Sequence, residues 1–205
     1  MKTVFIFGLG YVGVPLAQAL ADQGWQIRGT SRTPSKLADK AAQGWQILPF
    51  QSGQPLADPA AAFANIDAII STITAIGGSD PVLDAHGQDL ASFSGWSGYV
   101  SATSVYPDMP HEICYEDTAV APATARGKAR VVAEARWQQN FGTEIFRAAG
   151  IYGVGRSPFD ALRDGTARII EREGQVFNRI HVDDICRIII AAMAKPRSGR
   201  IINLA

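Results

Sequence analysis

The chain has 205 residues, 47% of them hydrophobic, and its 19 lysines and arginines balance 19 aspartates and glutamates. This length and apolar content are enough for one compact core, so we expect a single domain over residues 1–205. A net charge of zero gives no bulk attraction to nucleic acid or to an anionic membrane, which leaves small molecules as the expected ligands.

Strand-like apolar segments alternate with helical segments along the whole chain. This alternation predicts an α/β fold with a doubly wound parallel sheet that has helices on both faces. The expected strands are 3–7, 25–30, 45–50, 66–73, 98–102, 143–148 and 200–204. The expected helices are one that has Pro15 in its first turn and is ended by Gly24, and then 34–43, 60–63, 82–93, 123–140, 159–163 and 182–193. Pro49 cannot donate to a strand ladder, so the strand that contains it should lie near a sheet edge.

The first strand runs directly into the glycine-rich sequence Gly8-Leu-Gly10-Tyr11-Val12-Gly13. Three glycines spaced G-x-G-x-x-G between a strand and a helix are typical of a dinucleotide-binding loop. Gly8 would make the tight turn, Gly10 would let backbone N–H groups approach a pyrophosphate, and Gly13 would let the helix pack against the strand. The N-terminus of the helix would face the phosphate charge.

The end of the second strand bears on the choice of coenzyme. An acidic residue usually stands there and binds the adenosine ribose, but this chain has Ser31 followed by Arg32. A hydroxyl and a guanidinium can hold a 2′-phosphate that a carboxylate would repel, so the sequence favours NADP, with NAD as the alternative. Arg32 could instead be a solvated loop residue. Thr72 and Ile73, at the end of the fourth strand, should line the same coenzyme groove.

The cysteines and histidines give no metal site or disulfide framework. Cys114 and Cys186 lie far apart, as expected for free thiols of a reducing compartment, and His86 and His111 share no ligand spacing with them. The chain opens on a strand without a signal-peptide pattern, and no apolar run has the length of a membrane span. We therefore expect a cytoplasmic protein with no metal, nucleic-acid or membrane partner.

Four stretches, in this order, resemble the extended and atypical short-chain dehydrogenase/reductases of the NAD(P)-dependent epimerase/dehydratase type. They are the glycine loop; Tyr-Val-Ser-Ala-Thr-Ser-Val-Tyr-Pro at 99–107; Arg-Ala-Ala-Gly-Ile-Tyr-Gly at 147–153; and Arg-Ile-His-Val-Asp-Asp at 179–184. The resemblance implies about seven parallel strands, a coenzyme across their carboxyl ends, a reduced C-terminal substrate lobe and a possible homodimer. The coenzyme-binding residues that it implies, together with those argued above, are Gly8, Gly10, Tyr11, Val12, Gly13, Ser31, Arg32, Thr72, Ile73, Ser101 and Tyr152.

The chain departs from this family at all three catalytic positions. The family's catalytic Tyr, its partner Lys and its strand Ser or Thr correspond here to Arg126, Arg130 and Ala102. Arginine stays protonated in proteins and cannot relay a proton, and alanine has no donor. The arginines could instead anchor a substrate phosphate or carboxylate, since residues four apart share a helix face, or they could belong to a solvated face.

Substitute proton donors can be named, but each has an alternative structural role. Ser101, Thr103, Ser104 and Tyr106 adjoin the altered position, and Tyr152 should approach the nicotinamide side of the coenzyme. The hydroxyls could equally cap or turn the strand end, and the tyrosines could simply pack. His181 could reach substrate, but a role in ending a strand fits its position better, with Asp183 or Asp184 capping the next helix.

Three functions remain open from the sequence. The first is an NAD(P)-binding protein that resembles nucleotide-sugar epimerases and dehydratases but lacks their catalytic set. The second is a non-enzymatic NADP(H) sensor or scaffold, and the third is an active oxidoreductase or epimerase with a substitute proton donor. The opening of the chain also resembles nucleotide-sugar 6-dehydrogenases, which use a catalytic cysteine, but neither cysteine here has that context.

Overall fold

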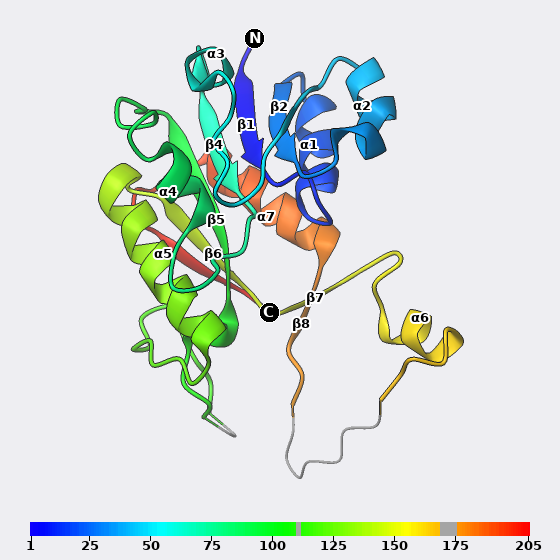
Figure 1. Ribbon diagram of the computed structural model, residues 1–205. Helices are drawn as coiled ribbons and strands as arrows, with labels where there is room; N and C mark the ends of the chain where they lie inside the picture. The colour runs from blue at the N-terminus through cyan, green and yellow to red at the C-terminus, as the bar shows by residue number, and fades with distance from the viewer. Residues whose placement is uncertain (110–111, 169–175) are drawn as a thin grey trace.

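The computed structural model describes residues 1–109, 112–168 and 176–205. Seven strands form one parallel sheet in the order β3-β2-β1-β4-β5-β6-β9, so the predicted doubly wound α/β fold is confirmed (Figure 1). Its strands are β1 (Thr3–Phe7), β2 (Gln26–Ser31), β3 (Gln46–Pro49), β4 (Ala68–Ser71), β5 (Trp96–Ala102), β6 (Glu144–Ala148) and β9 (Ile201–Leu204). The order reverses between β1 and β4, and ligands of open parallel sheets bind at such a point, beyond the carboxyl ends of the strands. β3, which ends at Pro49, is an edge strand, as expected.

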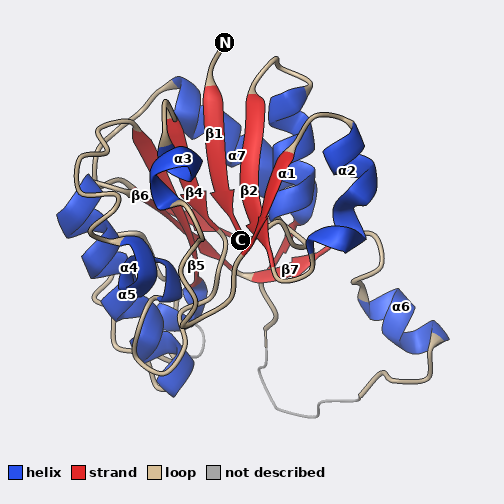
Figure 2. Cartoon of the chain, turned by 45° about the horizontal axis from the view of Figure 1, so that its top comes forward, coloured by secondary structure: helices blue, strands red, loops and turns tan. Residues whose placement is uncertain are grey.

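Helices cover both faces of the sheet (Figure 2). The longer helices are α1 (Gly13–Ala21), α5 (Ala125–Phe141) and α7 (Val182–Ala194). The shorter ones are α2 (Ala38–Ala42), α3 (Pro59–Phe63), α4 (Pro81–His86) and α6 (Pro158–Arg163), with 3₁₀ turns η1 (Pro34–Leu37) and η2 (Thr103–Val105).

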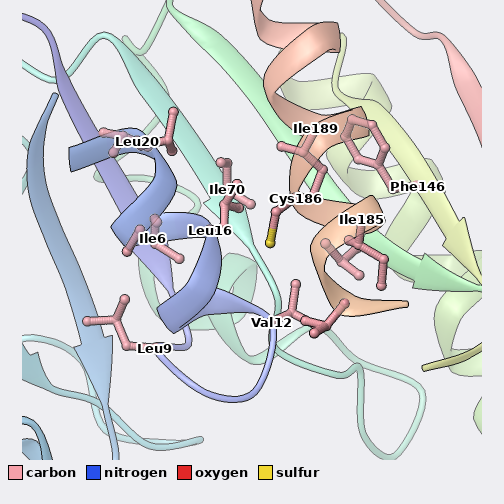
Figure 3. Packing of buried hydrophobic residues seen from close by; sticks show 14 of the residues in the cluster. Ile6, Leu9, Val12, Leu16, Leu20, Ile70, Phe146, Ile185, Cys186 and Ile189 are labelled. Carbon is pink, nitrogen blue, oxygen red and sulfur yellow. The ribbon is translucent and has the colours of Figure 1, made fainter. Parts of the chain in front are cut away.

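Strand alternation divides the core into two layers. Val4 and Ile6 of β1 pack into a cluster with α1 and α7, where Leu16 meets Cys186 and Ile189 (Figure 3). Phe5 and Phe7 point to the opposite face, into a cluster with α3, α4 and α5. Successive strand side chains point to opposite faces, so a strand buried on both faces is largely apolar, as β1 is from Val4 to Phe7.

Two expected helices are shorter than the sequence suggested. The segment 34–43 is a 3₁₀ turn followed by α2, and neither element has a buried residue, so no apolar face stabilises a longer helix. The segment 82–93 is helical only to the end of α4 at His86, and Gly87, a poor helix former, is its C-cap.

A third difference is a two-stranded arm that follows β6. β7 (Gly150–Tyr152), where the sequence predicted no strand, pairs in parallel with β8 (Arg179–His181). The arm carries α6 away from the body of the sheet, as Figure 1 shows in yellow. His111, one of the histidines considered as a metal ligand, and residues 169–175 lie outside the described residues.

Candidate dinucleotide site

The turn after β1 has the conformation that the glycine pattern predicts. Gly8 has a φ of +94°, in the left-handed region that glycine adopts readily. Its N–H donates to the Thr30 hydroxyl at 2.9 Å, and the Leu9 N–H donates to the Thr30 carbonyl at 2.7 Å. The neighbouring strand β2 therefore fixes the turn. Sequence reasoning missed Thr30, although it precedes the Ser31 position that was singled out.

The other two glycines meet different surroundings. A Cβ on Gly13 would lie 2.1 Å from the Gly8 carbonyl oxygen, so only glycine lets α1 begin this close to the turn. A Cβ on Gly10 would meet no atom within 4 Å. Gly13 is thus required by packing inside the protein, whereas Gly10 faces open space, where a ligand could approach the backbone.

Backbone donors converge on that open space. In the described part of the chain, the N–H groups of Tyr11, Val12 and Gly13 have no hydrogen-bond acceptor, whereas the Gly10 N–H donates to Gly8 at 2.8 Å. The three free N–H groups lie at the start of α1, where the helix dipole places partial positive charge. A cradle of free N–H groups at a helix N-terminus beside an unhindered glycine fits the pyrophosphate of a dinucleotide.

Thr72 and Ile73 lie against the same turn. The Thr72 hydroxyl donates to the Gly8 carbonyl at 2.7 Å, and the Ile73 side chain comes within 3.0 Å of the point that a Gly8 Cβ would occupy. The structure therefore brings the end of β4 to the glycine loop, at the reversal point of the sheet.

Ser31 and Arg32 end β2 beside this site. The Ser31 hydroxyl accepts a hydrogen bond from the Thr33 N–H at 3.2 Å. Arg32 is exposed, and among the described residues no hydrogen bond or ion pair engages its guanidinium. Its donors are therefore available to an anion.

Tyr11 joins the glycine loop to the arm. Its hydroxyl donates to the Val154 carbonyl at 3.3 Å, and the Arg156 guanidinium lies over its ring at 5.3 Å from the centroid. Next to this contact, Tyr152 meets His181 edge to face, with ring centroids 5.1 Å apart. Sequence reasoning missed Arg156, whose contact with Tyr11 is made across 145 positions and has no local signal.

A pocket in the arm opens beside these rings. Its lining combines aromatic and apolar side chains with polar groups, from Tyr152, Gly153, Ser157, Pro158, Phe159, Arg179 and His181. Tyr152 and His181 were both named from the sequence, and the pairing of β7 with β8 sets them opposite each other.

His181 ends β8, as expected, but the predicted cap of the next helix was wrong. The N-cap of α7 is His181 itself, whose Nδ1 accepts from the Asp183 N–H at 3.2 Å. Asp183 and Asp184 lie inside the first turn, where their charges complement the helix dipole instead.

Ser101 does not face the open groove. It is 2% exposed, and its hydroxyl donates to the Glu134 carboxylate at 2.5 Å. Glu134 in turn pairs with Arg147 at 2.8 Å. The side chain of Ser101 therefore points into a buried polar network, and a contact between Ser101 and the coenzyme stays a prediction.

Tyr106 belongs to the same network. Its hydroxyl donates to the Asn203 side chain at 2.7 Å and accepts from Arg147 at 2.8 Å, and the guanidinium also lies over the tyrosine ring. The hydroxyl therefore both donates and accepts a hydrogen bond inside the protein. Of the two roles that the sequence allowed for Tyr106, a substitute proton donor or a packed side chain, the structure favours the packed side chain.

The three positions that the resemblance aligns with catalytic residues lie near the carboxyl end of β5. Ala102 is the last residue of β5, and the following turn η2 packs against the first turns of α5. Arg126 is exposed and Arg130 is half-buried on that helix. The structure thus brings together the three positions that the sequence singled out.

The described residues contain neither a cluster of metal-ligating side chains nor a membrane-spanning helix. No group of three His, Cys, Asp or Glu side chains among them is placed to hold a metal ion, and both cysteines are free thiols. No helix in the described ranges has the length and apolarity needed to cross a membrane.

Comparison with known proteins agrees with this geometry. A family profile described as the NAD binding domain of 6-phosphogluconate dehydrogenase matches residues 3–116. Protein YeeZ of Escherichia coli K12 is 30% identical over 218 aligned positions, which cover 100% of this chain and 77% of YeeZ.

Solved structures share the fold. A functionally unknown conserved protein from Silicibacter pomeroyi superposes with a TM-score of 0.88 at 39% identity, over 100% of this chain and 72% of that one. UDP-glucuronic acid 4-epimerase from Bacillus cereus, in complex with NAD, superposes with a TM-score of 0.76 at 17% identity, over 99% of this chain and 78% of that one. At that identity, the likeness to the epimerase is one of fold.

Proposed function

Since the chain belongs to the family of the NAD binding domain of 6-phosphogluconate dehydrogenase and is a relative of YeeZ, we propose that it binds NADP(H) over the glycine loop, with NAD(H) as the weaker coenzyme. The single observation that carries this proposal is the set of free N–H groups at Tyr11, Val12 and Gly13 beside the open Gly10. These groups would bind the pyrophosphate, and Thr72 and Ile73 would hold the turn in place.

The preference for the phosphorylated coenzyme rests on Arg32. Its guanidinium lies at the end of β2, where the adenosine ribose binds in this fold, and has no protein partner in the described ranges. A bidentate contact to the 2′-phosphate would use these donors, and Ser31 would add a hydroxyl. Tyr152 would lie toward the nicotinamide end. Ser101, whose hydroxyl is bound to Glu134, is left out of the proposed set.

We place the chain in the epimerase/dehydratase branch of the short-chain dehydrogenase/reductases, on the four ordered motifs. A bound nicotinamide supplies hydride transfer, which normally needs a neighbouring proton donor. Ala102, Arg126 and Arg130 offer none, and the hydroxyls of Ser101 and Tyr106 are held inside the protein. A coenzyme-binding protein without the usual catalysis is therefore the function that the geometry supports best, and a sensor or scaffold is its simplest form.

A second candidate is an active oxidoreductase or epimerase with a substitute donor, and one observation favours His181. Because Nδ1 of His181 accepts the Asp183 N–H, the neutral ring carries its proton on Nε2, and the ring lines the arm pocket. His181 would then be the group that hands a proton to a substrate oxygen.

Two experiments test these alternatives. NADPH at about 100 times its dissociation constant should stabilise the fold by about 2.7 kcal/mol, and the same concentration of NADH should do less. To separate an enzyme from a sensor, the parent chain and the variant with Ala102→Thr, Arg126→Tyr and Arg130→Lys are screened against sugar nucleotides and simple carbonyl compounds. Turnover by the parent chain would establish the substitute donor, whereas turnover by the variant alone would support loss of catalysis.

The remaining assignments are part of the same proposal. We place the protein in the cytoplasm, as one domain that pairs with a second copy through the helices that follow β4 and β5. Sedimentation that detects only a monomer would exclude the dimer.

A further inference from the structure

Two arginines lie one helical turn apart at the start of α5. Gly127, between them, packs on the turn after β5, because a Cβ on it would lie 2.3 Å from the Ser104 carbonyl oxygen. This close approach fixes the first turns of α5 beside η2. Residues four apart share a helix face, so Arg126 and Arg130 project from the same side of α5.

Arg130 lies in the second turn of α5 and is half-buried, whereas Arg126, in the first turn, is exposed. α5 packs against β5 and against η2, the turn that follows β5. Because the strands of the sheet are parallel, the carboxyl end of β5 lies at the same end of the sheet as the glycine loop after β1. Arg126 and Arg130 are thus placed beside the segment that follows β5, at that end of the sheet.

The two buried carboxylates on or beside this part of α5, Asp80 and Glu134, are already engaged. Asp80 accepts two backbone N–H groups of α4 and the indole N–H of Trp137. Glu134 accepts from Ser101 and pairs with Arg147. Neither is hydrogen-bonded to Arg130, so the guanidinium keeps its donors.

The next arginine of α5, unlike these two, has an ion-pair partner. Arg136 pairs with Asp84 at 2.7 Å, whereas no ion pair or hydrogen bond to Arg126 or Arg130 occurs within the described ranges. Two guanidinium groups on one helix face, without protein partners, offer paired donors in the geometry that suits carboxylate and phosphate oxygens.

We propose that Arg126 and Arg130 form a binding site for an oxyanion, a carboxylate or phosphate carried by the molecule that this protein binds beside its coenzyme. The position of that molecule next to a coenzyme rests on the proposed function, but the oxyanion site itself does not. The two arginines, at positions that the resemblance aligns with catalytic residues, would then serve to recognise a ligand. This second ligand, bound beside the coenzyme, would be an anion.

The test uses the full chain with saturating NADPH, so that the glycine loop is filled and added anions report on other sites. Inorganic phosphate and malonate are titrated separately against the midpoint of thermal unfolding, with chloride holding the ionic strength constant. The variants are Arg126→Gln and Arg130→Gln. Lys128→Gln is the matched control, because it removes the same charge from the same turn of α5 but on the opposite side.

We expect one or both anions to raise the midpoint in the wild type and in Lys128→Gln, and to bind about tenfold or more weakly in each arginine variant. A response to phosphate alone would assign a phosphate ligand, and a response to malonate a carboxylate. No response in the wild type, or an equal response in all four proteins, would overturn the site.

Failure of this site and failure of the proposed function are distinguishable. Protein that binds NADPH but neither anion would refute the arginine site alone. If NADPH does not bind, the proposed function fails. The arginine site is then tested by titrating the same two anions, without coenzyme, against the wild type and the same three variants.

Discussion

The Glu134 carboxylate lies 2.8 Å from the Arg147 guanidinium in the protein interior, where each residue is only 4% exposed. The pair joins α5 to β6 and also holds the hydroxyls of Ser101 and Tyr106. Its position explains why two hydroxyls near the expected catalytic strand are turned inward.

Removing one partner of this pair should be costly. Glu134→Ala leaves the Arg147 charge buried and unpaired, and we expect the free energy of unfolding to fall by about 3–5 kcal/mol. Urea unfolding measures the change. As a control, Asp84→Asn breaks the partly exposed pair with Arg136 and should cost about 1 kcal/mol or less. Equal costs for the two variants would contradict a stabilising role specific to the buried pair.

The buried carboxyl of Asp80 should make the free energy of unfolding depend on pH in an unusual direction. Burial raises the pKa of its carboxyl above the ordinary value of 3.8, against the hydrogen bonds from Leu83, Trp137 and Val82. The folded state therefore favours the protonated form, and the stability that this carboxyl contributes is complete below 3.8 and lost as the pH rises through the raised pKa.

The comparison with Asp80→Asn isolates this effect. Unfolding in urea from about pH 4 to about pH 7 should show the wild type losing stability relative to the variant as the pH rises. A relative stability that increases with pH would mean that the folded protein lowers the pKa of Asp80 instead.

The two thiols should differ in reactivity. Burial, with a further contribution from the charge of Asp183, raises the pKa of the Cys186 thiol to about 12. Because the thiolate is the reactive form, Cys186 should react with a disulfide reagent only on unfolding. Cys114 is half-exposed and should react in the native protein. Mass spectrometry after native labelling assigns the site, and modification of Cys186 first would contradict this packing.

Substitution by alanine should lower the stability of the fold at Gly13 but leave it nearly unchanged at Gly10. Gly13→Ala places its Cβ against the Gly8 carbonyl, and the shift that follows should cost about 1–3 kcal/mol of stability. Gly10→Ala meets open space and should unfold at nearly the wild-type urea concentration. Equal stability of both variants would show that α1 does not pack on the turn as described.

Arg32 should set the coenzyme preference. Arg32→Gln removes the charge expected at the 2′-phosphate and should weaken NADPH binding by about 1.5–3 kcal/mol, while NADH binding changes little. Fluorescence titration with each coenzyme measures the two affinities. An equal loss for both coenzymes would place Arg32 elsewhere in the site, and no loss for either would make it a solvated loop residue.

The glycine loop and the segments that form strands could be predicted from the sequence because their signals are local. Gly8 and Gly13 each have a steric requirement within the protein, Gly10 leaves open space beside the loop, and apolar runs bounded by turns mark the strands. The end of α4 was less predictable, since the segment after Gly87 keeps a helical composition while the glycine at the C-cap ends the helix.

Side-chain partners from distant segments could not be predicted. Ser101 was expected at the coenzyme because its strand ends there, but its direction depends on Glu134, 33 positions away. The signal that could have revealed the network is Arg147, a charged residue in an otherwise apolar strand, which needs a buried partner. The pairing of β7 with β8 likewise joins three-residue strands too short to show periodicity.

The central claim is that the free N–H groups of the glycine loop bind a coenzyme pyrophosphate. Isothermal titration of the wild type and of Gly10→Val with NADPH tests it most directly, because a Cβ at this position meets no protein atom within 4 Å and the side chain would enter the space proposed for the pyrophosphate. The account predicts that the wild type binds and that Gly10→Val keeps its fold but loses binding. Absence of binding by the wild type, or equal binding by the two proteins, would contradict it.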